Sequence, residues 1–198
     1  NDTPLLGPTQ VDLGPGGILK IAVSNHSCAE VGGKTKCWGY NYLGHLGTGN
    51  TENLGDDVGE MGENLPFVEL GSPGSSNSLT VGFNHSCSTV SGAGYWIKCW
   101  GGNGFGQLGH GSSGAQGDEP GEMGDNLPWS LGGFSGSTPS VSSVDAGRYH
   151  TCANFIDGSA MCWGSNDYGQ LGISSSGPVG DNEIPSQYLS LGNSVKQG

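Results

Sequence analysis

The sequence predicts an all-β repeat protein, and three observations support this fold class. An eleven-residue motif, Cys-Trp-Gly-x-Asn-x-x-Gly-x-Leu-Gly, occurs three times, with successive copies 62 and 63 residues apart. A shorter motif, His-Ser/Thr-Cys, precedes each copy. The 40 glycines and the hydrophobic content of 33% suit short strands joined by tight turns. A fixed period of this size indicates supersecondary units that depend on their neighbours for stability.

The two motifs place the elements of each unit, which we expect to hold four short strands. The longer motif lies at Cys37–Gly47, Cys99–Gly109 and Cys162–Gly172, and the shorter at His26–Cys28, His85–Cys87 and His150–Cys152. A first strand precedes the shorter motif, at residues 18–23, 79–82 and 141–146. The Asn and Gly residues of the longer motif form a turn, which its leucine anchors by burial.

The second and third strands of each unit form a hairpin, which is clearest in the last copy. There, strand 149–155 is followed by the turn Ile156-Asp157-Gly158 and by strand 159–163. Alternation along the first of these strands places His150 and Cys152 on one face of the sheet, with their neighbours on the other.

All six cysteines fall into three local pairs, each of which spans a glycine-containing turn. No pair has the Cys-x-x-Cys spacing of a zinc site, and cysteines that face each other across a hairpin can bridge. Each bridge should stabilise the fold by about 2–3 kcal/mol. Three bridges indicate an oxidising compartment, so we expect a secreted or cell-surface protein. The expected bonds are Cys28–Cys37, Cys87–Cys99 and Cys152–Cys162; the alternative is three pairs of reduced core cysteines.

The charge balance argues against two classes of partner. The net charge is −12, and the six Lys and Arg residues form no dense patch. Nucleic acid and anionic membrane surfaces both require a basic face. Because no apolar run approaches about 20 residues, we also expect no membrane-spanning helix.

The residues around the motifs resemble the regulator of chromosome condensation repeat family. That repeat carries Gly-x-x-His-Thr-x-Ala, then a hairpin, then Trp-Gly-x-Asn-x-x-Gly-Gln-Leu-Gly, and residues 147–153 match its first part. The first copy departs at His45, where the family has glutamine, and Ser27 and Ser86 replace threonine. The resemblance covers nearly the whole chain and implies a β-propeller with blades of four antiparallel strands. The added cysteines are similar to those of the family's secreted, disulfide-bearing branch.

The resemblance further implies that three blades are part of something larger, since the family closes a ring of about seven. We place the units at about residues 11–66, 67–128 and 129–198. Residues 11–14 resemble residues 189–192, so the two ends are in the same phase. Three blades alone would leave open edges that invite association. We expect a portion of a longer propeller, which we favour, or an assembly of several chains.

A glycine-rich acidic insert connects the units, at residues 55–66 and 117–128 and in shortened form at 180–185. Oxygen-rich loops can hold calcium, which takes about six to eight oxygen ligands, although the EF-hand order of residues is absent. The alternative is a solvated connection whose Met and Leu-Pro residues pack against the propeller. The candidate calcium ligands are Asp56, Asp57, Glu60, Glu63, Asp118, Glu119, Glu122, Asp125, Asp181 and Glu183.

The chain contains no catalytic constellation, so we expect a protein that is not an enzyme and that uses no cofactor apart from the calcium just considered. There is no Gly-x-Ser-x-Gly elbow and no His-Glu-x-x-His. The repeated histidines are interpreted as buried hydrogen-bonding residues that fix a strand or turn, and the motif tryptophans as blade-packing residues. These residues are His26, His85 and His150, with Trp38, Trp100 and Trp163.

Three Asn-x-Ser/Thr sequons provide candidate glycosylation sites if the source is a eukaryote. They begin at Asn1, Asn25 and Asn84. The last two lie beside the repeated histidines, so their occupancy depends on which face of the sheet the asparagine takes.

These observations favour a non-enzymatic extracellular propeller that acts as a binding or structural module. In one form, its loops bind a protein or glycan partner. In the other, it is a subunit of a surface fibre or appendage that self-assembles through open blade edges. The alternatives are guanine nucleotide exchange on a small GTPase, which the family resemblance implies, and inhibition of a secreted enzyme.

Overall fold

The computed structural model describes residues 10–72, 75–91, 95–132 and 140–189, which form three antiparallel sheets of three strands each. The all-β prediction is therefore confirmed. We call each sheet, with the segments paired along its edge, a blade. Blade 1 contains β1 (Ile18–Val23), β2 (His26–Val31) and β3 (Lys34–Gly39). Blade 2 contains β4 (Ser75–Val81), β5 (His85–Ser91) and β6 (Tyr95–Gly101). Blade 3 contains β7 (Val141–Ala146), β8 (His150–Phe155) and β9 (Ala160–Gly164).

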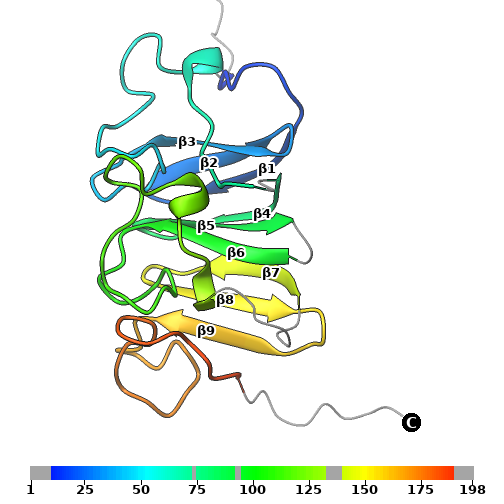
Figure 1. Cartoon of the computed structure of the whole chain (residues 1–198). Coiled ribbons are helices and arrows are strands. Elements are labelled where there is room, and N and C mark those ends of the chain that lie inside the picture. Colours follow the sequence, from blue (N-terminus) through cyan, green and yellow to red (C-terminus); the bar gives the residue numbers. More distant parts are fainter. Residues whose placement is uncertain (1–9, 73–74, 92–94, 133–139, 190–198) are drawn as a thin grey trace, which may run out of the picture.

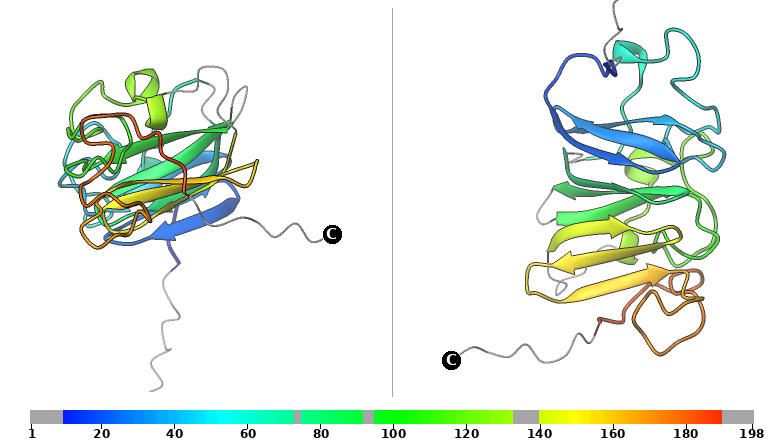
Figure 2. Two further views of the ribbon diagram at one scale, coloured as in Figure 1. Left: turned by 90° about the horizontal axis from the view of Figure 1, so that it is seen from below. Right: turned by 180° about the vertical axis from the view of Figure 1, so that it is seen from behind.

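The sheets lie one above another in chain order (Figure 1). In the view from below, each sheet is turned relative to its neighbour, as the blades of a propeller are (Figure 2). The first strand of each sheet contacts the first strand of the next, so β1, β4 and β7 line one side of the stack. Blades 1 and 3 form the two ends, and each has one face without a neighbouring blade among the described residues.

Two elements differ from the prediction: β4 begins at Ser75 and ends at Val81 instead of spanning residues 79–82, and no sheet among the described residues has the expected fourth strand. Phe67 forms an isolated bridge with Lys36 of β3, and Tyr188 forms the equivalent bridge with Met161 of β9. In blade 2, the 3-10 helix η3 (Ser130–Gly132) contacts β6 instead. A proline precedes this segment in every unit, and proline cannot donate to a strand ladder. The fourth place therefore holds a bridge or a helical turn in place of a strand.

The three hairpins place the cysteines of each pair directly opposite each other. The structure contains the bonds Cys28–Cys37, Cys87–Cys99 and Cys152–Cys162, each with a Cα–Cα distance of 4.1 Å. No cysteine of the chain is free. Each hairpin is thus stapled across its own two strands, and none of the disulfides joins one blade to another.

The hydrophobic core lies between successive sheets. One blade contributes its disulfide and the leucine of its long motif, and the next blade contributes apolar residues of its first strand and the motif tryptophan. Between blades 1 and 2 these are Cys28, Cys37, Leu46, Leu79, Val81 and Trp100. Between blades 2 and 3 they include Cys87, Cys99, Leu108, Val144 and Trp163. The tryptophans Trp100 and Trp163 are wholly buried, as expected for blade-packing residues.

Candidate functional site

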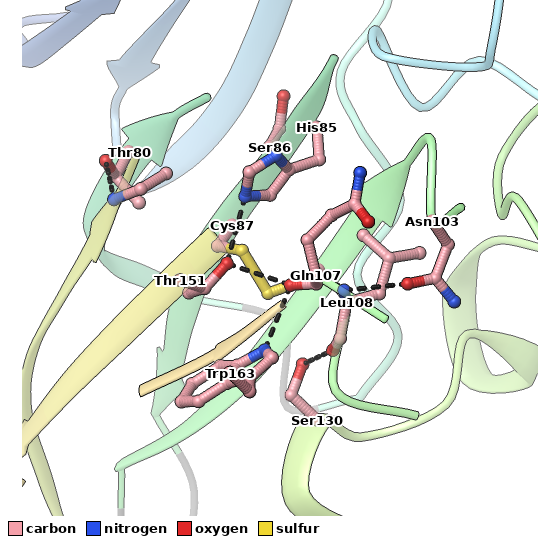
Figure 3. The surroundings of a disulfide bond; sticks show 12 residues. Thr80, His85, Ser86, Cys87, Asn103, Gln107, Leu108, Ser130, Thr151 and Trp163 are labelled. Carbon is pink, nitrogen blue, oxygen red and sulfur yellow. Dashed lines mark hydrogen bonds between the residues drawn. A yellow bond between two sulfur atoms is a disulfide. The ribbon is translucent and has the colours of Figure 1, made fainter. Parts of the chain in front are cut away.

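A chain of hydrogen bonds crosses the junction between blades 2 and 3 (Figure 3). The backbone carbonyl of Gln107 accepts from the Thr151 hydroxyl at 2.8 Å and from the Trp163 indole at 2.9 Å. The same hydroxyl lies 2.9 Å from Nε2 of His85. A hydroxyl has one proton, which Thr151 gives to Gln107, so the hydroxyl accepts from His85 and that ring is the neutral Nε2–H tautomer. We call this set of groups the interblade relay.

The junction between blades 1 and 2 repeats the interblade relay with different residues. His26 Nε2 lies 2.6 Å from the Ser86 hydroxyl, which donates to the His45 carbonyl at 2.9 Å. The Trp100 indole donates to the same carbonyl at 2.9 Å. The sequence predicted that these histidines make a buried hydrogen bond that fixes a strand or turn. His26 and His85 are buried and make such a bond, and the bond joins each blade to the next, through a hydroxyl 60 residues further along in the case of His26.

Burial keeps the relay histidines neutral. Desolvation, with a smaller contribution from the neighbouring His45, lowers the pKa of His26 to about 3. Desolvation likewise lowers the pKa of His85 to about 3, with smaller contributions from three other histidines. The Nδ1 atoms of His26 and His85 are buried without a hydrogen-bond partner, as expected for unprotonated ring nitrogens that face no donor. The relay therefore requires neutral imidazole.

The long motif builds the turn that presents the relay carbonyl. Buried Asn103 accepts from the Leu108 backbone N–H at 2.9 Å and donates to the Ser112 carbonyl at 2.6 Å. The motif glycine Gly106 has φ +75°, and a Cβ there would lie 2.3 Å from the backbone nitrogen of Asp181 in the third insert. Only glycine allows the next insert to approach this closely. The motif thus positions one blade against the next.

The acidic inserts fold around their own glutamates. One Glu60 oxygen accepts from the backbone N–H groups of Gly55 and Asp57, at 2.7 and 3.0 Å. In the second insert Glu122 accepts from Gly117 and Glu119 in the same way, at 2.8 and 3.1 Å. Two carboxylates that were candidates for calcium are therefore used as backbone acceptors, and they close each insert as a compact loop.

The other candidate calcium ligands do not converge. Among the described residues, no group of three or more His, Cys, Asp or Glu side chains could hold a metal ion. Asp125 accepts from the backbone N–H of Ser72 at 2.8 Å, and Glu183 accepts from Gly180 at 3.0 Å. Asp56, Asp57, Glu63 and Glu119 are exposed. The solvated-connection alternative matches this arrangement better than an oxygen cage does.

Two lysines hold the inserts against the blades, and their burial was not predicted from the sequence. Lys36 is 2% exposed, and its Nζ donates to the carbonyls of Leu13 and Gly62 at 2.9 and 2.8 Å. Lys98 is 1% exposed and donates to the Gly124 carbonyl at 2.7 Å. Their ammonium groups also lie over the rings of Phe67 and Trp129, at 4.7 and 4.4 Å. Burial lowers the pKa of Lys98, and Asp125 opposes that shift.

A set of aromatic side chains gathers on the loops at one end of the strands. The turns after β1, β4 and β7 and those after β3, β6 and β9 lie at the same end, because the first and third strands of a sheet run parallel. We call this end of the blades the motif face. Its aromatic residues are Tyr40, Tyr42, Phe83, Phe105, Tyr149 and Tyr168.

These aromatic residues form two contacting groups and one isolated side chain. Tyr40 and Tyr42 stack at 6.4 Å, and Tyr42 is 68% exposed. Tyr149 contacts both Phe83 and Phe105, at 5.8 and 5.2 Å between ring centroids. Arg148 lies 4.8 Å from the Phe83 ring centroid. Tyr168, at 95% exposed, projects from the third motif turn. Exposed aromatics and an arginine on loops of a rigid scaffold are typical of recognition surfaces.

The two described sequons differ in accessibility. Asn25 is exposed, whereas Asn84 is partly buried and its Oδ1 accepts from Gln107 Nε2 at 3.1 Å. Asn1 lies outside the described residues. No helix in the described ranges has the length and apolar character needed to cross a bilayer.

The fold and the relay define this chain as an array of propeller blades. A family model described as "Regulator of chromosome condensation (RCC1) repeat" matches residues 99–153 and 157–197, and a second model of that description matches residues 141–170. The chain belongs to the regulator of chromosome condensation repeat family.

Three known proteins are similar to this chain in sequence or in structure. The ultraviolet-B receptor UVR8 of Arabidopsis thaliana is 32% identical over 142 residues, which is 69% of this chain and 26% of the receptor. The crystal structure of human WBSCR16 matches with a TM-score of 0.62 at 20% identity, over 87% of this chain and 40% of that one. Prp20p of Saccharomyces cerevisiae matches with a TM-score of 0.59 at 18% identity, over 90% and 41%. The chain therefore spans less than half the length of each, and at these identities the two solved structures share its fold.

Proposed function

We propose that this chain is an extracellular propeller module that binds a protein partner through its motif face. The observation that carries the proposal is the group of exposed aromatic side chains, together with Arg148, on loops held by three stapled hairpins. Aromatic residues and arginine supply most of the binding energy of protein interfaces. Loops on a rigid scaffold lose little conformational entropy on binding, which favours affinity.

The charge near the motif face favours a basic partner. Tyr40 and Asp56 line the same hollow of about 240 Å³, so an aromatic ring and a carboxylate face one volume. The chain as a whole carries a net charge of −12. A cationic side chain of the partner would interact with both groups, by charge and over the ring face. We therefore expect the affinity to fall as the salt concentration rises.

Site-specific photo-crosslinking tests the proposed surface. A photoreactive phenylalanine analogue is placed at Tyr40 or, in a control, at Tyr95, which has the same exposed fraction of 44% but lies at the opposite end of β6. The probe is the secreted protein fraction of the source cells. We expect one protein to be captured from Tyr40 and not from Tyr95, with capture reduced by Tyr42→Ala. Equal capture from both positions, or capture of glycan alone, would contradict the proposal.

The extracellular assignment rests on the three disulfides, since such bonds persist in oxidising compartments and are rare in the cytosol. A test is to trap the thiols of the chain with a maleimide as its own cells are lysed. We expect none of the six cysteines to react before reduction. Six reactive cysteines would place the chain in a reducing compartment and would favour an intracellular function.

Nucleotide exchange is the second candidate, and the fold match to Prp20p favours it. The structural report on Prp20p describes its binding properties to Gsp1p and histones. The similarity is 18% identity over 41% of that chain, so only the fold is shared. We expect no acceleration of GDP release from Gsp1p by this chain. A rate increase that depends on the motif face would reverse this ranking.

A further inference from the structure

A groove lies at the junction between blades 1 and 2, along the edge of the blades that is opposite to β1 and β4. Its walls are the loop after the long motif of blade 1, the segment after the first acidic insert, and the second acidic insert. Its volume is about 810 Å³, and its largest apolar side chains are Leu54, Phe67 and Met123. We call it the open groove. A concave site of this size, lined mostly by apolar side chains, suits a ligand or a short peptide segment.

The equivalent place at the junction between blades 2 and 3 is filled by Ile184 of the third insert. A Cβ added to Gly111, in the loop after the second long motif, would lie 3.0 Å from Cδ1 of Ile184. A Cβ added to Gly132, in the segment after the second insert, would lie 3.4 Å from Cγ2 of the same residue. The aliphatic side chain of Ile184 therefore reaches both of the walls that correspond to those of the open groove.

The second insert approaches the open groove in the same way but supplies no such side chain. A Cβ added to Gly49 would lie 3.4 Å from the carbonyl oxygen of Glu119 and 3.5 Å from Cα of Pro120. At Gly111 the corresponding backbone neighbour is the nitrogen of Ile184, at 3.2 Å. Pro120 thus takes the place of Ile184, and its side chain closes on its own backbone nitrogen and cannot span the groove. The open groove is therefore missing the aliphatic side chain that its counterpart contains.

The open groove also contains a carboxylate without a partner. Glu69 is exposed and is the one charged residue among those that line the groove. Its side chain makes no hydrogen bond or ion pair with any residue in the described ranges. The counterpart of Glu69 in blade 2, three residues after the proline of the insert, is the buried Leu131. A cationic side chain in the open groove would therefore gain a salt bridge without displacing an existing one.

An adjoining hollow extends the open groove along the segment after the first insert. It has a volume of about 300 Å³ and shares Glu69 with the open groove. Leu70 and Lys34 also line it, and the ammonium group of Lys34 lies 5.4 Å from the centroid of the Phe67 ring. The two hollows together form a track with a carboxylate where they meet, which fits an extended segment better than a compact small molecule.

We propose that the open groove binds an extended segment of a protein partner in which an aliphatic side chain lies next to a lysine or arginine. The aliphatic side chain would fill the groove as Ile184 fills its counterpart, and the basic side chain would pair with Glu69. The net charge of −12 favours a basic segment over an acidic one. The open groove shares no lining residue with the aromatic groups of the motif face, so this contact does not depend on the function proposed above.

Selection of a phage-displayed library of random peptides on the oxidised 198-residue chain tests the proposal. The library is first depleted on the variant Pro120→Ile, in which isoleucine takes the place that Ile184 has in the third insert, so that peptides bound to other surfaces are removed. We expect the remaining peptides to share an aliphatic residue beside a lysine or arginine. If no peptide survives, or if the survivors lack this pattern, the proposal is overturned.

The affinities of synthetic copies of these peptides give a second test. Fluorescence polarisation should show that they bind Pro120→Ile about tenfold or more weakly than the unaltered chain. Pro178→Ile, the same change on an exposed loop of blade 3, should leave the affinity unchanged. An equal loss of affinity from both substitutions would overturn the proposal.

Reversal of the groove charge tests the pairing with Glu69. Glu69→Lys should weaken peptide binding about tenfold or more and should restore it for a peptide whose basic residue is replaced by glutamate. Glu63→Lys makes the same change at an exposed position of the first insert that does not line the groove, and it should alter the affinity by less than about twofold. Circular dichroism verifies that each variant is folded. Equal losses from the two substitutions would show that general charge, and not Glu69, attracts the segment, and would overturn the proposal.

Discussion

The two junctions between blades use the same relay but differ in two of its residues, the hydroxyl residue (Ser86 or Thr151) and the residue that offers the carbonyl (His45 or Gln107). The junction of blades 2 and 3 has Gln107, whose amide braces the motif turn by accepting from the Phe105 N–H at 2.9 Å and donating to Asn84 at 3.1 Å. The junction of blades 1 and 2 has His45, whose Nδ1 lies 3.1 Å from the Tyr40 carbonyl, whose ring stacks on His26 at 5.3 Å, and whose Nε2 is buried without a partner. The hydroxyl bonds to the carbonyl of this residue have similar lengths at both junctions, 2.9 and 2.8 Å, because they use the backbone and not the side chain.

The residue at the position of His45 and Gln107 therefore has two separate roles. The backbone carbonyl docks the next blade and tolerates a change of side chain. The side chain determines which hydrogen bonds stabilise its own turn. It also determines how the stability of the junction changes as the pH falls.

Lowering the pH should have the largest effect on the free energy of unfolding. His26 and His85 have folded pKa values of about 3 against 6.5 unfolded, so the unfolded chain binds more protons between these values. Stability is therefore fully present above pH 6.5 and falls as the pH drops toward about 3. The loss should be about 1.4 kcal/mol per pH unit for each histidine, or about 4–5 kcal/mol between pH 6.5 and 4.5. Urea unfolding at a series of pH values measures it; a flat profile would contradict the neutral relay.

Truncating a relay tryptophan should come next. Trp100→Ala and Trp163→Ala each remove a wholly buried indole and a hydrogen bond, at a cost of about 3–5 kcal/mol. If the backbone carbonyl does the same work at both junctions, the two costs should agree within about 1 kcal/mol. Trp38→Ala is the control, because this side chain is only partly buried and should cost less. Chemical denaturation gives all three values, and a large gap between Trp100 and Trp163 would refute the equivalence.

Removing the relay hydroxyl should have an intermediate effect. Thr151→Val keeps the shape of the side chain but leaves the His85 N–H without an acceptor, at a cost of about 1–3 kcal/mol. The same substitution at Thr80, whose hydroxyl accepts from the Ala146 N–H at 3.1 Å at the partly exposed inner side of the junction, should cost less. Thermal unfolding compares the two variants. A larger loss of stability for Thr80→Val than for Thr151→Val would contradict the claim that the relay hydroxyl stabilises the junction.

Restoring the family residue should have the smallest effect. His45→Gln removes a buried nitrogen that lacks a partner and exchanges the bond to the Tyr40 carbonyl for an amide that can brace the turn as Gln107 does. We expect a gain of about 0.5–1 kcal/mol at neutral pH and a shallower loss of stability in acid. The measurement is the difference in unfolding free energy at pH 7 and at pH 5. A loss of stability at both would indicate that the His45 ring contacts with His26 and Tyr40 matter more than an amide brace.

Local features of the fold were predictable from the sequence. Cysteine spacing across a glycine turn predicted the hairpins and the strand register, because the two strands of a tight hairpin must lie opposite each other. The first strands at residues 18–23 and 141–146 match β1 and β7. The number of strands was less predictable, since the fourth segment is bounded by Pro66 and Gly71 and is too short for a ladder.

Contacts between blades were not predictable, because they depend on how the sheets stack and not on spacing along the chain. His26 meets Ser86 only because blade 2 packs on blade 1. The buried lysines Lys36 and Lys98 run against the usual exposure of lysine, and their one signal is that each precedes a motif cysteine. The aromatic residues of the motif face occupy variable positions of the motif, so the repeat pattern concealed them.

Hydrogen exchange of the tryptophan indoles, followed by NMR, tests the relay most directly. We predict slow exchange for Trp100 and Trp163, which donate to buried carbonyls, and fast exchange for Trp38, whose indole donates to no group among the described residues. Uniform fast exchange of all three would show that the blades are not joined by these bonds.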